Sequence, residues 1–283
     1  MQKDKVKIAW VGKHFGEEPP LVGNKAQGAG GIFFSGCHLH CVFCQNYQIS
    51  QENIGKEYSI EELAEIMLDL QAQNAVNIDL VTPTIWSKQI KEAVLKAKTK
   101  GLNIPVIWNS NAYESVEMIK SLEGIVDIYL PDFKYGIEEV GEKYSGIKKY
   151  PEIAKKAINE MFYQVGNLKI HNNIAYKGVI VRHLVLPNNL ENSYKALEIL
   201  AELDNRMHLS LMSQYSPLYN AAKYPEINRQ LTKEEWSKIQ KHLKRLEFEN
   251  GWLQDLTSVE MLVPDFTKEE PFKKLKSGKI KLE

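Results

Sequence analysis

The chain has 283 residues, of which 43% are hydrophobic and 25% are charged, and these are ordinary values for a globular protein. Basic and acidic side chains number 36 each, so the formal net charge is +0, and bulk charge does not indicate nucleic acid or an anionic membrane as a partner. This length suits one large domain or two small ones.

The first five residues are polar and lack the apolar run of a signal peptide, and no segment reaches the length of a membrane span. The three cysteines of the chain all lie within residues 37–44, and an odd number of thiols cannot pair completely in disulfides. Free thiols without an export signal predict a reducing, cytoplasmic setting and no membrane partner.

Residues 1–31 are rich in glycine and proline, which predicts a loop-rich N-terminal extension with a short apolar start at residues 8–11. His14, Glu17 and Glu18 have the chemistry of metal ligands, but we interpret them as hydrogen-bonding and solvated groups of a loop. The glycines at 28–31 are not followed by lysine and serine or threonine, so we predict no nucleoside triphosphate site.

A short apolar strand at 32–34 leads into a loop with the spacing Cys37-x3-Cys41-x2-Cys44. Three thiolates on one short loop can hold three irons of a [4Fe-4S] cluster and leave the fourth iron open to a small molecule. A zinc site usually has four protein ligands, or three and a water molecule. His38 or His40 could complete such a site, so a zinc-binding structural module is the alternative interpretation.

Apolar strands and amphipathic helices alternate along the rest of the chain. Two capping boxes, Ser59 with Glu62 and Thr232 with Glu235, each predict the start of a helix, and further helices are expected at 87–99, 114–122, 151–164 and 191–203. Strands are expected at 78–81, 104–108, 125–130, 178–186 and 208–212.

With the strand at 32–34, this makes six strands that alternate with helices, which predicts parallel βα units joined by right-handed crossovers. A closed barrel of this kind needs eight units. The predicted fold class is therefore α/β, a partial (β/α)6 TIM-like barrel with parallel strands over residues 32–250. Residues 251–283 are expected to form a C-terminal extension whose charged end, from about residue 268, frays.

Polar side chains recur where the expected strands end. In barrels of parallel strands, the chemistry lies at the C-terminal ends of the strands. Each polar group alone has a structural interpretation as a turn, a helix cap or an ion pair, but their shared end predicts a binding site. The groups are Thr82, Thr84, Asn109, Asn111, Asp132, Lys134 and Gln214, together with Arg182 inside the strand at 178–186.

The motif C-x3-C-x-aromatic-C after an apolar strand resembles the signature of radical S-adenosylmethionine (SAM) enzymes. The resemblance extends across residues 8–250, to an uncharacterised family related to pyruvate formate-lyase activating enzyme, through the segments 31–37, 44–47, 81–84, 126–135, 181–187 and 211–215. Asp132 and Lys134 match the aspartate-x-lysine of the activating enzymes, and Arg182 matches their arginine in strand five. Their histidine after strand six is replaced here by Gln214 and Tyr215.

The resemblance implies one [4Fe-4S] cluster per chain, held by Cys37, Cys41 and Cys44, with SAM bound at the open iron. Thr82, Thr84 and the carbonyls of their turn can receive the SAM ammonium, and Lys134 or Arg182 can pair with its carboxylate. Because the cofactor carries the chemistry, no catalytic side chain beyond the cluster and SAM is expected. Phe43 is expected to pack near the adenine. The ribose hydroxyls are assigned to Asn109, Asn111, Asp132 and Gln214.

The predicted function is reductive cleavage of SAM to a 5'-deoxyadenosyl radical that abstracts hydrogen from an unidentified substrate, with activation of a glycyl-radical enzyme as the candidate role. Since the chain has no second cysteine group, flavodoxin or ferredoxin is implied as the electron donor. The alternatives are the zinc-binding structural module and radical modification of another macromolecule, and the balanced charge disfavours RNA.

Overall fold

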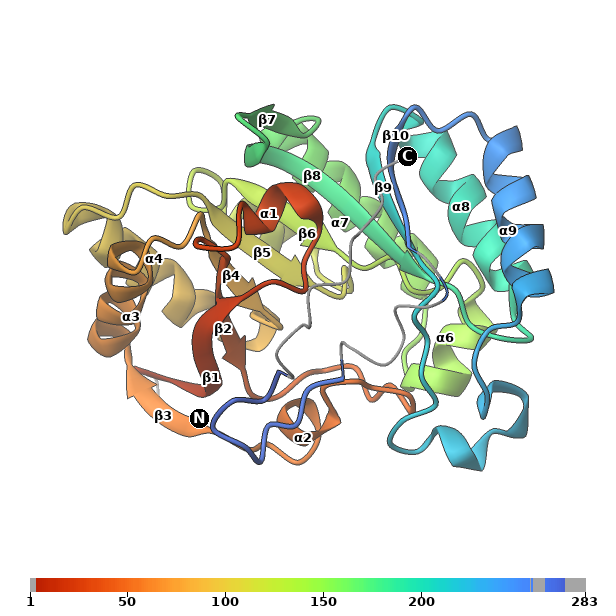
Figure 1. Cartoon of the computed structure of the whole chain (residues 1–283), viewed down its shortest axis with the longest axis horizontal. Coiled ribbons are helices and arrows are strands. Elements are labelled where there is room, and N and C mark those ends of the chain that lie inside the picture. Colours follow the sequence, from red (N-terminus) through yellow and green to blue (C-terminus); the bar gives the residue numbers. More distant parts are fainter. Residues whose placement is uncertain (1–3, 255, 257–262, 273–283) are drawn as a thin grey trace.

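A computed structural model describes residues 4–254, 256 and 263–272 of the chain. At its centre, six strands lie side by side in chain order and run parallel (Figure 1). The sheet is open, because its order begins and ends with different strands. The predicted partial barrel of parallel strands is therefore confirmed. The six strands are β2 (Ala29–Phe34), β4 (Ile78–Val81), β5 (Val106–Ser110), β6 (Ile128–Pro131), β8 (Ile174–Leu184) and β9 (His208–Met212).

The sheet extends beyond these six strands at both edges. β1 (Lys5–His14) runs antiparallel to both β2 and β3 (Lys56–Ser59), and β10 (Asn250–Leu253) runs parallel to β9. The expectation of a loop at the N-terminus was wrong, because Val6 and Ile8 are buried while their neighbours are less so, which is the alternation of a strand. β10 also spans the predicted boundary between residues 250 and 251.

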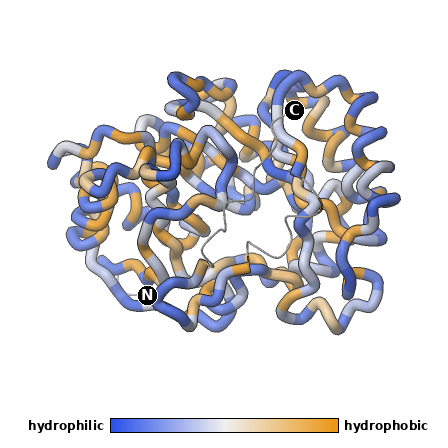
Figure 2. The backbone as a smooth tube through the Cα atoms, viewed as in Figure 1, coloured by the Kyte–Doolittle hydropathy of each residue, from blue (hydrophilic) through white to orange (hydrophobic). Residues whose placement is uncertain are grey.

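Helices cover the outer face of the sheet (Figure 1), and hydrophobic residues recur along helices and strands alike (Figure 2). Those that are buried form one core with residues from both helices and strands. The two predicted capping boxes are present, at the starts of α3 and α9, where Ser59 and Thr232 accept hydrogen bonds from the backbone of Glu62 and Glu235. The larger outer helices are α3 (Ile60–Ala72), α4 (Ser87–Thr99), α7 (Tyr150–Val165), α8 (Leu190–Asp204) and α9 (Lys233–Arg245).

Several short elements were not expected from the sequence. α1 (Pro19–Val22), α2 (Tyr47–Ser50) and α6 (Glu138–Ser145) are short helices, and β7 (Lys169–His171) pairs antiparallel with β8. α5 (Val116–Lys120) is shorter than the helix expected at 114–122. Residues 273–283, most of the tail expected to fray, lie outside the described residues.

The inner side of the sheet has an apolar end and a polar end. Leu21 of α1 packs in one cluster with Ile107 and Ile128, which lie near the starts of β5 and β6, and with Ile180 of β8. Asn77 Nδ2, just before β4, donates to Leu21 O at 2.7 Å. α1 therefore closes the end of the barrel at which the strands begin. The chain leaves a cavity toward the opposite end, where the strands finish. Within the part of the chain that the structure describes, no helix is long and apolar enough to cross a membrane.

Candidate cofactor site

The cysteine loop leaves β2 at Gly36, whose φ of 89° is a backbone conformation that favours glycine. A Cβ atom at this position would meet Ile85 Cδ1 at 2.6 Å. The loop is tied down by backbone hydrogen bonds from His40 to Ser145 O at 3.1 Å and from Val42 to Tyr144 O at 2.8 Å. The C-terminal end of α6 thus holds the loop against the barrel.

All three cysteines are free and line one cavity of about 250 Å³. Each sulfur has a hydrogen-bond partner: Leu39 N approaches Cys37 at 3.4 Å, Ser145 Oγ donates to Cys41 at 2.9 Å, and Ser50 Oγ lies 3.2 Å from Cys44. Such contacts stabilise negative charge on a sulfur atom.

Burial raises the pKa of all three thiols, to about 12 for Cys37 and to about 11 for Cys44. The neighbouring Cys41 adds to the rise at both, because two adjacent thiolates repel each other. A positively charged metal centre removes this penalty and binds the thiolate form. The three thiols therefore fit a metal centre as its ligands.

The three cysteine sulfurs do not have the spacing of ligands of a single tetrahedral zinc ion. Sulfur ligands of one tetrahedral zinc, with bonds of about 2.3 Å, lie about 3.8 Å apart. Among the described residues, the sulfur atoms of the three cysteines are not all within 4.8 Å of one another. His38 Nε2 lies 2.9 Å from Tyr113 O and His40 Nδ1 lies 2.7 Å from Gln51 Oε1, so both candidate fourth ligands have other partners.

An ion-pair network centred on Arg182 of β8 crosses the cavity. Its guanidinium donates to Asp132 Oδ1 at 2.7 Å, to Glu17 Oε2 at 2.8 Å and to Asn109 Oδ1 at 2.7 Å. Lys134 Nζ donates to the other oxygen of Asp132 at 2.7 Å. Although burial opposes ionisation, the two cations hold the pKa of Asp132 below its usual range. The predicted groups after strands three and four and in strand five are thus brought together.

The other predicted residues divide into two groups. Phe43, Thr82, Asn111 and Gln214 line the same cavity as the cysteines. Thr84 is not among its lining residues in the described structure, because its hydroxyl donates to Glu114 Oε1 at 2.8 Å. Glu114 is buried and also accepts from Trp108 and Ser110, so Thr84 belongs to a structural hydrogen-bond group behind the cavity.

The interpretation of His14, Glu17 and Glu18 as solvated loop groups was wrong. His14 and Glu18 are 5% and 6% exposed, and all three residues line the cavity. Asp79, which was not among the predicted site residues, lies beside His14 and is fully buried. The signal for Asp79 was a charged residue inside the apolar strand 78–81. The N-terminal segment therefore contributes one wall of the site.

Comparison with known proteins identifies the domain. Residues 32–162 match the family model of the radical SAM superfamily. The chain carries a radical SAM domain. An uncharacterized protein of Methanocaldococcus jannaschii is 38% identical over 239 residues, which are 80% of this chain and 63% of that protein. This chain therefore spans less than two thirds of the length of that relative.

Two solved structures share the fold of this radical SAM domain at low sequence identity. Methylornithine synthase (PylB) has a TM-score of 0.52 at 15% identity, covering 77% of this chain and 61% of that one. SuiB of Streptococcus suis, solved with S-adenosylmethionine bound, has a TM-score of 0.51 at 12% identity, covering 80% of this chain and 47% of that one. The predicted cofactors, a [4Fe-4S] cluster and SAM, are those that the radical SAM family uses.

Substituting Ser145 tests the hydrogen bond to Cys41. In Ser145→Ala we expect the midpoint potential of the reconstituted radical SAM cluster to fall by tens of millivolts, because hydrogen bonds to ligand sulfurs stabilise the reduced cluster. Redox titration followed by electron paramagnetic resonance (EPR) measures it. Ser121→Ala, which removes an exposed hydroxyl far from the loop, is the control. Equal potentials in the two variants would contradict the role of Ser145.

Proposed function

We propose that this protein cleaves SAM at a [4Fe-4S] cluster held by Cys37, Cys41 and Cys44 and uses the product radical to abstract hydrogen from a substrate. The observation that supports this most is the opening of three free thiols into the cavity that holds the Arg182 network. When bound, the reduced cluster supplies the electron that converts SAM to methionine and a 5'-deoxyadenosyl radical.

Lys134 is the better partner for the SAM carboxylate. Arg182 already donates to three different side chains, whereas the described contacts of the Lys134 ammonium are with Asp132. An ammonium has three donors, so Lys134 can bind a carboxylate and keep its bond to Asp132. Arg182 then acts as a positioning residue, because it fixes Asp132 and through it Lys134.

The remaining SAM contacts are assigned by chemistry. Thr82 has a left-handed conformation with a φ of 58°, and its backbone N–H donates to Asn109 O. Thr82 also lines the cavity, so its hydroxyl oxygen is assigned to the SAM ammonium. Gln214 Oε1 is buried without a partner among the described residues, so it is available to a ribose hydroxyl. Asn109, Asn111 and Asp132 stay assigned to ribose, Phe43 to adenine, and Thr84 supports the Thr82 turn through Glu114.

Reconstitution under anaerobic conditions tests the proposed function. We expect about four irons per chain, as one cube requires, and release of 5'-deoxyadenosine after dithionite and SAM are added. The matched control is the same protein without dithionite, which should release none. Stoichiometric zinc with no iron after reconstitution, or an intact cluster that releases no 5'-deoxyadenosine, would overturn the proposal.

We further propose that the hydrogen donor is a glycyl-radical enzyme and that flavodoxin or ferredoxin delivers the electron in a reducing cytoplasm. The support is the match of Asp132, Lys134 and Arg182 to the activating-enzyme pattern, together with three unpaired thiols. Incubation of a glycyl-radical enzyme with this protein, SAM and reduced flavodoxin should produce a glycyl-radical EPR signal. Release of 5'-deoxyadenosine without that signal would argue against this substrate.

A further inference from the structure

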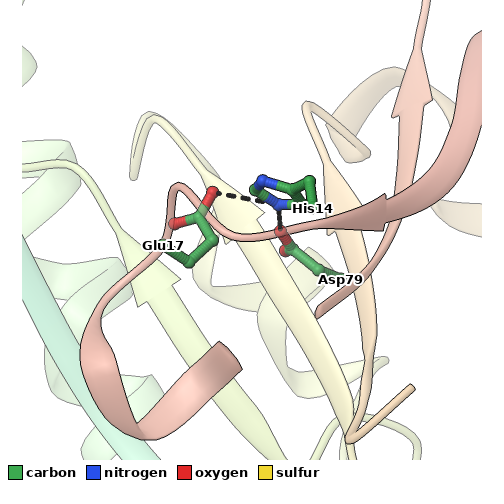
Figure 3. A group of neighbouring side chains, drawn as sticks. All are labelled: His14, Glu17 and Asp79. Carbon is green, nitrogen blue, oxygen red and sulfur yellow. Dashed lines mark hydrogen bonds and ion pairs between the residues drawn. The ribbon is translucent and has the colours of Figure 1, made fainter. Parts of the chain in front are cut away.

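Two of the residues that line the cavity, His14 and Glu17, meet the fully buried Asp79, which is not itself among the lining residues. His14 ends β1, Glu17 follows in the next loop, and Asp79 lies in the middle of β4 (Figure 3). His14 Nε2 lies 3.3 Å from Asp79 Oδ2 and 3.6 Å from Glu17 Oε1, and the three ligand atoms all lie within 4.8 Å of one another. We propose that His14, Glu17 and Asp79 bind one divalent transition-metal ion, separate from the cysteine-bound cluster.

The distances fit ligands of a single ion. With metal–ligand bonds of about 2.1 Å, ligand atoms at adjacent positions lie about 3.0 Å apart in octahedral and about 3.4 Å apart in tetrahedral geometry. The two distances from His14 Nε2 fall close to these values. One imidazole and two carboxylates are a donor set that suits Mn²⁺, Fe²⁺ or Zn²⁺, whereas Mg²⁺ and Ca²⁺ prefer oxygen ligands throughout.

The charge of Asp79 calls for a cation at this place. Its side chain is completely buried, and among the described residues Oδ1 has no hydrogen-bond partner. Its other oxygen contacts His14 and the neutral amide of Asn109. A buried carboxylate with one unsatisfied oxygen is costly unless a cation is bound. Arg182 does not fill this role, since its donors go to Asp132, Glu17 and Asn109.

The surroundings hold the imidazole in place and leave room for it. A Cβ atom on Gly31, the β2 residue paired with Asp79, would come within 3.0 Å of His14 Cδ2. The His14 ring stacks on Phe272 and meets Phe33 edge to face. Glu18 Oε2, also buried and without a partner among the described residues, lines the same cavity. These contacts restrict the ring, and a restricted ligand binds metal at a lower entropic cost.

Metal binding replaces the hydrogen bond between His14 Nε2 and Asp79 Oδ2 and also changes a second contact of the ring. Gly16 N donates to His14 Nδ1 over a long distance of 3.4 Å, so without metal the ring proton sits on Nε2. When Nε2 binds the ion, this proton moves to Nδ1 and the Gly16 contact is lost. Because Gly16 precedes Glu17, the loop that carries Glu17 then has to shift.

Mn²⁺ titration of the anaerobically reconstituted protein tests the site. Free Mn²⁺ is followed by its six-line EPR signal, and the oxidised [4Fe-4S] cluster has none. We expect one Mn²⁺ to bind per chain and pulsed EPR of bound Mn²⁺ to show coupling to a single imidazole nitrogen. If the unaltered protein bound no Mn²⁺, or if the bound Mn²⁺ showed no coupling to nitrogen, the proposed metal site would be refuted.

Variants then assign the ligands. Asp79→Asn and His14→Gln are expected to weaken Mn²⁺ binding by more than about 100-fold, beyond the 10- to 100-fold effect of losing a group that only supports a ligand. Glu234→Gln, which removes an exposed carboxylate of α9, should bind as the unaltered protein does. The iron content of each variant reports whether its fold is intact. Unchanged Mn²⁺ affinity in iron-loaded Asp79→Asn would refute the proposal.

This result is independent of the proposed function. Cys41→Ala should lose the cluster and still bind Mn²⁺, because none of the three ligands lies in the cysteine loop. A protein that cleaves SAM and binds no Mn²⁺ would overturn only the second site. A protein that binds Mn²⁺ at His14 and cleaves no SAM would overturn only the proposed function.

Discussion

Cys41→Ala is expected to lose the iron–sulfur cluster, with iron falling from about four per chain to background after reconstitution and with no release of 5'-deoxyadenosine. Cys41 is the most buried of the three thiols, its sulfur accepts from Ser145, and the pKa values of Cys37 and Cys44 both respond to it. Two remaining thiols can hold only two irons of a cube. Iron analysis and chromatography of the reaction products measure both effects.

The control for this prediction is Ser145→Ala, which keeps all three cysteines and should retain about four irons. The two variants alter neighbouring buried groups, so a difference in iron content reflects the lost ligand and not a disturbed loop. A Cys41→Ala protein with full iron content and full SAM cleavage would show that the cluster is held elsewhere.

Arg182→Met is expected to lower the free energy of unfolding of the metal-free protein by about 3–5 kcal/mol, because it leaves two largely buried carboxylates, Asp132 and Glu17, without their common cation. The pKa of Asp132 should rise, since Arg182 is the largest influence that lowers it. SAM binding should weaken as well, because Asp132 no longer holds Lys134 in place. Urea denaturation measures the first effect, and equilibrium dialysis with SAM measures the last.

Two variants control for side-chain loss in general. Arg206→Met removes an exposed arginine that pairs with Asp204 and should change stability little. Arg182→Lys keeps the charge but cannot contact three partners at once, so its stability should fall between those of the unaltered protein and Arg182→Met. Equal unfolding free energies for Arg182→Met and Arg206→Met would refute the central position of Arg182.

The elements that the sequence predicts best have local causes. The strands at 78–81 and 208–212 and the helix at 87–99 are found with the expected bounds. Apolar periodicity and capping boxes involve neighbours in the chain, so they can be recognised without knowledge of the fold. β1 was missed because Gly12 and the glycines and prolines that follow the strand were interpreted as a loop. Its pairing with β2 depends on a second strand, and the pattern of β1 alone shows that pairing only in part.

The polar site shows the same division. Parallel strands bring their C-terminal ends to one edge, so the approach of Asp132, Lys134 and Arg182 to the cysteine loop follows from the predicted topology. Thr84 shows the limit of that rule, because the residue two positions after Thr82 already turns behind the strand to Glu114. Side-chain direction at a strand end depends on the turn that follows.

The cysteine spacing, the order of the βα units and the polar groups at the strand ends can be recognised from the sequence alone, because each rests on a pattern within a short segment. The position of His14 and Glu17 inside the barrel, beside Asp79, could not be predicted in this way, because Asp79 is 65 residues from His14 in the chain. That approach requires β1 to pair antiparallel with β2, and β2 to pair in register with β4. Strand pairing is a long-range contact that no local pattern encodes.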